Sequence, residues 1–260
     1  MKRSPWKALS SRSVLLLLGF LAGCSGGVSS HKPLPCREQF DLGRQKFERK
    51  KYLQATEEFK IFVFNCPGSA NVDTAQFFLA MSYFNQKDYT TAAGEFRKLL
   101  NSFPTSDFAD DAMFMLGLSD YKQSPGPELD QIYTLQALEN LQNFKDIYPA
   151  SPLLPEVEKY IQECRNKLAE KTYRNGRLYF RLGEYKSCRV YLAKVLEEYP
   201  DTKWAAQAQF LVAESYRLES QKGEALSEYQ KLIDNYPNGK LSEQSRKRID
   251  ALKADRVKQN

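Results

Sequence analysis

Five prolines in this chain each follow an apolar segment that has the same internal spacing. They are Pro67, Pro104, Pro149, Pro200 and Pro237. Twelve residues before each proline stands a small residue: Ala55, Ala92, Ala137, Cys188 and Ala225. Eight residues before each stands a large apolar residue: Phe59, Phe96, Leu141, Leu192 and Tyr229. Five residues before each stand Phe62, Leu99, Phe144, Val195 and Leu232. A recurring spacing of this kind predicts one structural unit that is repeated five times.

A second set of small residues precedes each of these segments and indicates a first helix. The set is Gly43, Ala80, Gly117, Gly176 and Ala213. Each unit is therefore predicted to be two antiparallel helices that approach closely at the small residues. The proline ends the second helix, because its ring cannot continue a helix and it disfavours helical geometry in the residue before it. A single hairpin cannot bury its apolar face alone, so the units stack.

These offsets resemble the tetratricopeptide (TPR) pattern of small, small, aromatic and proline residues. We therefore predict an all-α fold, a right-handed TPR superhelix of five helix-hairpin repeats. A last helix, over residues 240–258, is predicted to cap the array.

Two departures from the period divide the array. In the third repeat the two small residues are eight positions further apart than usual, which predicts a protruding loop over residues 124–131. Before Gly176 a stretch without proline or glycine predicts a long helix over residues 155–182, roughly 42 Å long at 1.5 Å per residue. Residues 36–149 are then repeats 1–3, and residues 150–260 hold repeats 4–5, the long connecting helix and the capping helix.

The N-terminus is typical of an export signal. Four basic residues and no acidic one precede an apolar stretch over residues 14–20, and Leu21-Ala22-Gly23-Cys24 follows it. This arrangement predicts a signal peptide over residues 1–23, because the apolar core is too short to span a bilayer. Residues 24–35, rich in Ser, Gly and Pro, are predicted to be a flexible tether.

Cys24 at the predicted cleavage site resembles the lipobox cysteine of bacterial lipoproteins. The resemblance implies a diacylglyceryl group on its sulfur and an acyl group on its amine, which together anchor the mature chain to a membrane. Ser25 follows the cysteine where inner-membrane lipoproteins carry Asp, so the outer membrane is favoured. The alternative is an ordinary signal peptide with an incidental cysteine.

Composition argues against most catalytic chemistry. Removing residues 1–23 takes away four positive charges and lowers the formal charge from +6 to +2, which weakens any case for nucleic-acid binding. The chain has one histidine, His31, in the predicted tether. Catalytic triads, Cys–His pairs and His-ligated metals are therefore not expected. Acidic pairs such as Asp110-Asp111 read as surface charges, so we predict a protein that is not an enzyme and holds neither metal nor cofactor.

An acylated cysteine followed by five TPR units resembles the BamD family of outer-membrane protein assembly factors. The motifs that carry the resemblance are Met113-Phe114-Met115-Leu116-Gly117, the loop over residues 124–131, Tyr133-Thr134, Cys164-Arg165-Asn166-Lys167-Leu168-Ala169 and Tyr199-Pro200-Asp201-Thr202. The family implies a scaffold on the periplasmic face of the outer membrane. It implies as partners the periplasmic domains of a BamA-like barrel protein, unfolded outer-membrane proteins and further lipoproteins. It also implies that the N-terminal repeats receive the C-terminal signal of the unfolded proteins. The alternative is a TPR lipoprotein scaffold for pilus assembly or cell-wall synthesis.

TPR proteins bind peptides in a groove lined by the first helix of each hairpin, at fixed positions of the repeat. Those positions give the candidate groove residues Phe40, Arg44, Phe47, Phe77, Met81, Phe84, Tyr121 and Lys122, with Glu48, Asn85, Phe114 and Leu118 beside them. Rings for apolar side chains and Arg44 or Lys122 for a carboxylate would suit a peptide that ends in an aromatic residue. The alternative is core packing, since an aromatic residue recurs at the position of Phe40 in all five repeats.

The remaining cysteines divide into a pair and two single residues. Cys36 and Cys66 each lie fifteen residues from Lys51, near the turn of the first hairpin, so the antiparallel helices bring them side by side. Outside the cytoplasm such thiols oxidise, which predicts a Cys36–Cys66 disulfide; the alternative is two free buried thiols. Cys188 occupies a small-residue position and is predicted to lie in the core. Cys164 and Cys188 do not lie at equal distances from the turn near Gly183, so no disulfide between them is predicted.

Overall fold

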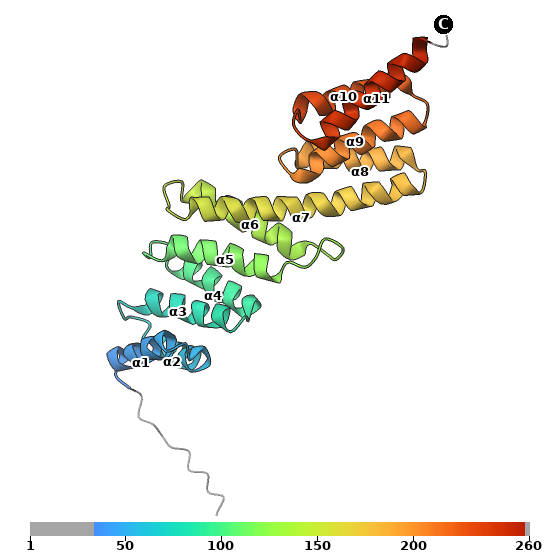
Figure 1. Cartoon of the computed structure of the whole chain (residues 1–260). Helices are drawn as coiled ribbons and strands as arrows, with labels where there is room; N and C mark the ends of the chain where they lie inside the picture. The colour runs from blue at the N-terminus through green and yellow to red at the C-terminus, as the bar shows by residue number, and fades with distance from the viewer. Residues whose placement is uncertain (1–33, 258–260) are drawn as a thin grey trace, which may run out of the picture. The chain divides into compact units, whose positions relative to one another are not determined.

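The computed structural model describes residues 34–257 in backbone and residues 34–254 in side chains (Figure 1). Cys24, the predicted signal peptide over residues 1–23, His31 and nearly all of the predicted tether lie outside the described residues. Within the described part every regular element is an α-helix, and none of these helices is both long enough and apolar enough to cross a membrane.

The described residues form eleven helices in five consecutive hairpins and a final single helix. They are α1 (Cys36–Glu48), α2 (Tyr52–Asn65), α3 (Val72–Asn85), α4 (Tyr89–Ser102), α5 (Ala109–Gln123), α6 (Ile132–Ile147), α7 (Leu154–Arg181), α8 (Tyr185–Glu198), α9 (Lys203–Leu218), α10 (Lys222–Asn235) and α11 (Lys240–Val257). Each helix packs against the next along the chain, as Figure 1 shows. The predicted TPR fold is confirmed.

The core consists of the residues that define the repeat. All fifteen positions at twelve, eight and five residues before the prolines are 0% exposed. The small residues of the first helices face this core at close range. A methyl group added at Gly43 would lie 2.8 Å from the ring of Phe59, and one at Gly117 would lie 2.8 Å from Leu141. Close approach of the two helices therefore requires glycine at these two positions.

The prolines end the second helices in the predicted way. Each of these helices stops two residues before its proline, and the residue between leaves helical geometry, as Cys66 does at φ −124° and ψ 45°. The turn inside the hairpin also recurs. Seventeen residues before the proline, four repeats place a residue at positive φ: Lys50, Lys87, Gly183 and Ser220. In the first repeat the N–H of Lys51 then donates to the carbonyl of Lys46 at 2.9 Å, which closes the helix C-terminus.

The third repeat lacks this turn because the loop over residues 124–131 replaces it. The loop lies between α5 and α6 at the predicted position and is fixed to α7. Lys167 of α7 donates to the hydroxyl of Ser124 at 2.6 Å, and Lys171 donates to the carbonyl of Leu129 at 2.5 Å. Glu128 pairs with Arg174. Helix α7 covers residues 154–181, one residue earlier at each end than predicted, and packs against α5, α6, α8 and α9.

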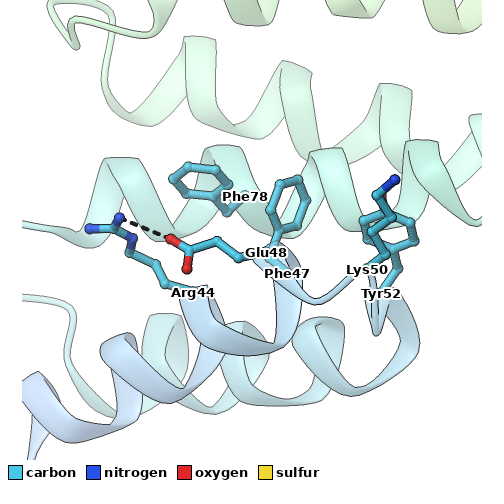
Figure 2. A pocket seen from close by; sticks show the side chains of 6 residues that line it. All are labelled: Arg44, Phe47, Glu48, Lys50, Tyr52 and Phe78. Atoms are coloured by element: carbon cyan, nitrogen blue, oxygen red, sulfur yellow. Dashed lines mark hydrogen bonds and ion pairs between the residues drawn. The ribbon is translucent and has the colours of Figure 1, made fainter.

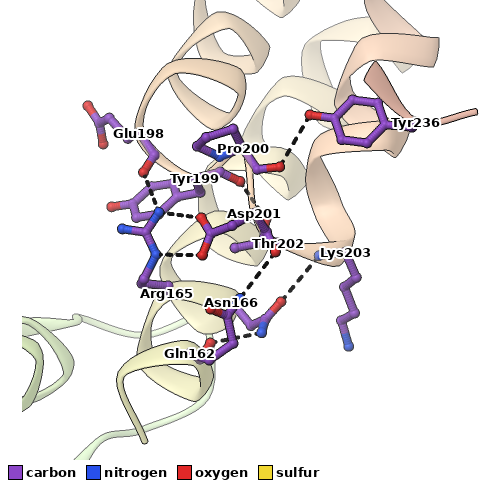
Figure 3. Close-up of polar contacts among 10 residues, drawn as sticks. All are labelled: Gln162, Arg165, Asn166, Glu198, Tyr199, Pro200, Asp201, Thr202, Lys203 and Tyr236. Atoms are coloured by element: carbon purple, nitrogen blue, oxygen red, sulfur yellow. Dashed lines mark hydrogen bonds and ion pairs between the residues drawn. The ribbon is translucent and has the colours of Figure 1, made fainter. Parts of the chain in front are cut away.

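A polar network joins α7 to the loop that follows α8, and it accounts for the Tyr-Pro-Asp-Thr motif (Figure 3). Arg165 donates through Nε to Asp201 at 3.0 Å and through Nη2 to the carbonyl of Glu198 at 3.0 Å. The hydrogen bond from Arg165 holds the pKa of Asp201 below its ordinary value, against the opposing effect of partial burial. The hydroxyl of Tyr236 donates to the carbonyl of Pro200 at 3.3 Å, so the turn after α10 joins the same network.

Helix α11 closes the C-terminal end of the array through a buried carboxylate. Glu214 of α9 accepts hydrogen bonds from Arg217 at 2.6 Å and from the hydroxyl of Tyr229, and Arg248 of α11 lies 2.9 Å from it. Burial raises the pKa of Glu214, but these hydrogen bonds and the two guanidinium charges outweigh it and leave that pKa below its ordinary value. Ile249 is buried beside them, so the predicted capping helix contributes both apolar and ionic contacts.

Candidate peptide-binding site

A hollow of about 320 Å³ opens between the first two hairpins, at the end of α1 (Figure 2). It is lined by Arg44, Phe47, Glu48, Lys50, Tyr52 and Phe78, and we call it the N-terminal hollow. Three of these residues, Arg44, Phe47 and Glu48, come from the groove positions predicted for repeat 1. They lie on the last turns of α1, while Tyr52 begins α2 and Phe78 comes from α3.

Aromatic rings form the apolar part of the hollow. The ring of Phe47 meets that of Phe78 at a centroid distance of 5.0 Å and that of Tyr52 at 5.5 Å, both edge to face. Phe78 in turn stacks on the fully buried Phe59 at 5.9 Å. The rings at the surface are thus supported by the core, which gives a bound side chain a firm apolar contact.

Charged groups form the rim. Nη2 of Arg44 lies 3.1 Å from Oε1 of Glu48, one helical turn further on, and the two side chains are 51% and 64% exposed. An ion pair this exposed contributes little to stability, so Arg44 can exchange its partner for the carboxylate of a ligand. Lys50 adds a second cation at the rim, from the left-handed turn between α1 and α2.

The other predicted groove residues of repeats 1 and 2 lie mostly against the core. Phe40 is 6% exposed and packs on Phe59 and Phe62, so at this position the structure agrees with the core-packing alternative. Phe77 is half-buried and stacks on Phe108 at 4.7 Å.

In repeat 2 two of the predicted groove residues lie partly at the surface. Met81 and Phe84 are half-buried there, and the ring of Phe84 meets Tyr89 edge to face at 5.2 Å. They therefore extend the aromatic surface of the first helices into the second repeat.

In repeat 3 the predicted groove residues other than Lys122 pack in one cluster with residues of α7. Phe114 and Leu118 are buried. The hydroxyl of Tyr121 donates to Glu163, its ring lies 4.9 Å from that of Tyr160, and Nζ of Lys167 lies 5.2 Å from its centroid. Burial, then the hydrogen bond to Glu163, raises the pKa of Tyr121, so the phenol stays neutral. Lys122 is exposed beside it.

Sequence reasoning missed Lys50, Tyr52 and Phe78. A signal for Tyr52 was present: an aromatic residue near the end of a first helix is followed five positions later by a tyrosine that begins the second helix. This pair occurs as Phe47–Tyr52, Phe84–Tyr89 and Phe180–Tyr185, each edge to face at 5.2–5.5 Å. Phe78 follows Phe77, and only packing decides which of two adjacent rings faces the hollow.

The first hairpin is closed at its opposite end by a covalent link. Cys36, which begins α1, and Cys66, just after α2, are joined by a disulfide with their Cα atoms 6.0 Å apart. Cys164 and Cys188 are free and buried, and burial raises the pKa of the Cys188 thiol to about 11. Cys188 fills the small-residue position of repeat 4, where its side chain is 0% exposed.

A second hollow, of about 360 Å³, lies between α9 and α11 and is lined by Phe210, Gln244, Lys247, Arg248 and Ala251. It offers one ring, and its Arg248 is engaged with Glu214. Among the described residues no cluster of three or more His, Cys, Asp or Glu side chains is arranged to hold a metal ion.

Stacked helical hairpins in this register define a TPR protein, a class whose surfaces serve protein–protein interactions. A family model described as "YfiO: Outer membrane lipoprotein" matches residues 34–225, and the chain belongs to that family. This confirms the resemblance to the BamD family drawn from the sequence. No curated protein matches the sequence.

Solved structures of TPR proteins are similar over most of the chain. The TPR2AB domain of yeast Sti1, in a complex with pHSP90, is 14% identical with a TM-score of 0.41 and coverage of 78% of both chains. A thermophilic TPR protein of Thermus thermophilus is 18% identical with a TM-score of 0.37, covering 84% of this chain and 98% of that one. Pseudomonas aeruginosa PilF is 16% identical with a TM-score of 0.33, covering 84% and 88%.

Proposed function

We propose that this protein is a non-enzymatic scaffold of the outer-membrane β-barrel assembly machinery. A lipid on Cys24 attaches it to the periplasmic face of the outer membrane. Its first two repeats bind the C-terminal signals of unfolded outer-membrane proteins. The family match over residues 34–225 supports the lipoprotein and outer-membrane parts of this proposal.

The observation that carries the peptide-binding part is the chemistry of the N-terminal hollow. Rings of Phe47, Tyr52 and Phe78 stand beside Arg44, which is half-exposed and held by one weak ion pair. When a chain ends in an aromatic residue, that last residue carries both a ring and the terminal carboxylate. The ring would occupy the aromatic part of the hollow, and the carboxylate would take the place of Glu48 at Arg44.

This proposal narrows the groove predicted from the sequence to repeats 1 and 2. In repeat 3 the hydroxyl of Tyr121 is bonded to Glu163 of α7, and Lys167 of α7 lies over one face of its ring. A peptide that follows the first helices would therefore end its contacts before repeat 3. The periplasmic domains of a BamA-like protein and other lipoproteins would bind at surfaces outside the N-terminal hollow.

A peptide-binding titration with a matched pair of charge reversals tests the site. A fluorescent peptide from the C-terminus of an outer-membrane β-barrel is titrated with the mature protein, Arg44→Glu and Arg97→Glu. Arg97 is an exposed arginine on α4, so its reversal changes net charge equally without touching the hollow. We expect R44E to weaken binding about tenfold or more, the scale of a lost charge-assisted hydrogen bond, and R97E to bind like the parent. Equal losses would show that only net charge matters.

The ligand supplies a second matched control for the same experiment. Amidation of the peptide's C-terminus removes the carboxylate and should weaken binding to the parent but not to R44E. If amidation weakens binding to both proteins equally, Arg44 is not the carboxylate partner.

A scaffold for pilus assembly or cell-wall synthesis would keep this fold and change the partner. Co-purification from detergent-solubilised membranes separates the two functions. We expect recovery of a β-barrel protein with several periplasmic domains. Recovery of pilus or cell-wall proteins without that barrel would overturn the proposed function.

A further inference from the structure

The outward side of α2 carries three apolar side chains along its length. Leu53 is 67% exposed, Ile61 is 42% exposed and Phe64 is 85% exposed. At 100° per residue these three fall within one arc of the helix, so they form a stripe rather than scattered surface residues. We call this stripe the outer face of α2. Single exposed apolar residues are ordinary on protein surfaces, whereas exposed apolar residues grouped in one patch mark interaction sites.

The other repeats show what this face usually carries. The stripe occupies positions fourteen, six and three residues before the proline, and those positions are exposed in all five second helices. In repeats 2 to 5 they hold Thr90, Lys98 and Asn101; Leu135, Asn143 and Asp146; Lys186, Lys194 and Glu197; and Gly223, Lys231 and Asp234. The fold therefore does not require apolar residues here. The first repeat alone has three of them.

The first repeat is also the one nearest to Cys24 along the chain. Eleven residues separate Cys24 from Cys36, and a fully extended chain of that length spans at most about 40 Å. Phe64 is two residues before Cys66, and the disulfide joins Cys66 to Cys36, where the tether meets the fold. A lipid on Cys24 would hold this end of the array within reach of the bilayer.

The charges on the same face suit a lipid interface. Glu57 and Lys60 lie between the apolar residues, and their charged atoms are 3.9 Å apart, so they offset each other. Nζ of Lys60 also lies 5.3 Å from the ring centroid of Tyr83. The stripe thus presents one ring and two aliphatic side chains without net charge, which is compatible with shallow burial at the boundary of headgroups and acyl chains.

We propose that the outer face of α2 rests on the membrane that holds the lipid anchor, with Phe64 inserted furthest. This contact would add buried apolar area to the anchor and would set which side of repeat 1 faces the periplasm. The inference rests on the proposed anchoring at Cys24, and it assigns α2 a surface separate from the N-terminal hollow.

The test is tryptophan emission from register-matched positions in vesicles. The lipidated mature protein is reconstituted into vesicles of phosphatidylethanolamine and phosphatidylglycerol as the parent, Phe64→Trp and Asn101→Trp. Phe64 and Asn101 are equivalent positions of repeats 1 and 2, and both are exposed, so neither change disturbs the core. Emission of the parent, which comes from Trp204 in the mature chain, is subtracted.

We expect the F64W emission to shift to shorter wavelength on reconstitution and to lose intensity when the acyl chains are brominated. The N101W emission should do neither. The pair Ile61→Trp and Lys98→Trp repeats the comparison at a second register position. Equal quenching of F64W and N101W would overturn the inference. A shift without bromine quenching, which grows with protein density, would show that a second copy covers the face, and would overturn it too.

Flotation of the same vesicles separates this inference from the proposed function. If the parent floats with the vesicles and F64W is not quenched, only the lipid contact of α2 is wrong. If the parent does not float, the proposed anchoring at Cys24 is wrong, and the proposed membrane contact of α2 is then wrong as well.

Discussion

Repeats 1 and 3 place an aromatic ring at the same position, four residues after the small residue of the first helix, and surround it differently. In repeat 1 the ring of Phe47 lines an open hollow with Arg44 and Glu48 at its rim. In repeat 3 the hydroxyl of Tyr121 is bonded to Glu163 of α7, and Lys167 lies over its ring. In both repeats the ring contacts an aromatic residue of the next hairpin, Phe78 or Tyr160, but only Tyr121 also has polar partners there.

The cause of this difference is which residues the following helix places beside the ring. Both α3 and α7 put an aromatic seventh residue against it, Phe78 or Tyr160. The tenth and fourteenth residues of α7 are Glu163 and Lys167, which engage Tyr121, whereas α3 has Met81 and Asn85 there. No helix in the described residues gives Phe47 a polar partner of this kind, and the disulfide at the far end of the hairpin holds repeat 1 together instead.

The largest expected effect comes from removing that covalent link. The disulfide joins residues that are 30 apart in the sequence and so restricts the unfolded chain. The double change Cys36→Ala and Cys66→Ala removes this restriction and should lower the free energy of unfolding by about 3 kcal/mol. Urea unfolding with and without reductant measures it: reductant should destabilise the parent and leave the double variant unchanged. A parent that is insensitive to reductant, and that shows four free thiols when it is produced without Cys24, would contradict the disulfide.

Exchanging the two rings tests the contrast itself. Tyr121→Phe removes a hydrogen bond to a carboxylate and should cost about 1–2 kcal/mol of unfolding free energy. Phe47→Tyr adds a hydroxyl at the edge of an open hollow and should change stability by less than about 0.5 kcal/mol. Chemical denaturation of both variants is the measurement. Equal costs would show that the two positions have the same surroundings.

Acid should loosen α7 from the C-terminal repeats. The pKa of Asp201 is depressed, chiefly by the hydrogen bond from Arg165, so ionised Asp201 stabilises the fold. That stabilisation is complete above the unfolded-state pKa of about 3.9 and is lost as pH falls through the lower folded-state pKa. Because the pair is partly exposed, it should contribute at most about 1 kcal/mol.

The control for this pH effect is Asp201→Asn, which cannot ionise. Unfolding free energy measured from pH 6 downward should fall less steeply below pH 4 for D201N than for the parent. Parallel curves would mean that Arg165 and Asp201 do not couple pH to stability.

The smallest effect belongs to the rim of the hollow. A double-mutant cycle of Arg44→Ala and Glu48→Ala should give a coupling energy of about 0.3–0.5 kcal/mol, as expected for an exposed pair one helical turn apart. A value above about 1 kcal/mol would mean that Arg44 is held firmly by Glu48 and poorly placed to exchange it for a ligand.

The sequence predicted the fold in detail because the period repeats what packing requires. Each small residue, large apolar residue and proline reports one constraint of a hairpin, and five copies make chance agreement improbable. The same logic placed the loop before α6 and the bounds of α7 within one residue. The left-handed turn was not foreseen, since only Gly183 of its four residues is a glycine.

The candidate site was predictable only in part, for a physical reason. Register tells which side of a helix a residue occupies, but not what the next helix places over it. Phe47 and Tyr121 were equivalent candidates by register, and α7 makes them different. Phe78 lines the hollow from the second hairpin, and Lys50 lines it from the turn after α1. The residue pattern on α1 does not reveal either of them.

Photo-crosslinking from register-matched positions tests most directly that repeat 1 is open and repeat 3 is covered. A photoreactive amino acid is placed at Glu48 or at Lys122, which are equivalent and both exposed. Each variant is irradiated with a β-barrel C-terminal peptide. We predict capture of the peptide from position 48 and little from position 122, with competition by unlabelled peptide. Capture from position 122 alone, or from the distal repeats alone, would contradict binding at the N-terminal hollow.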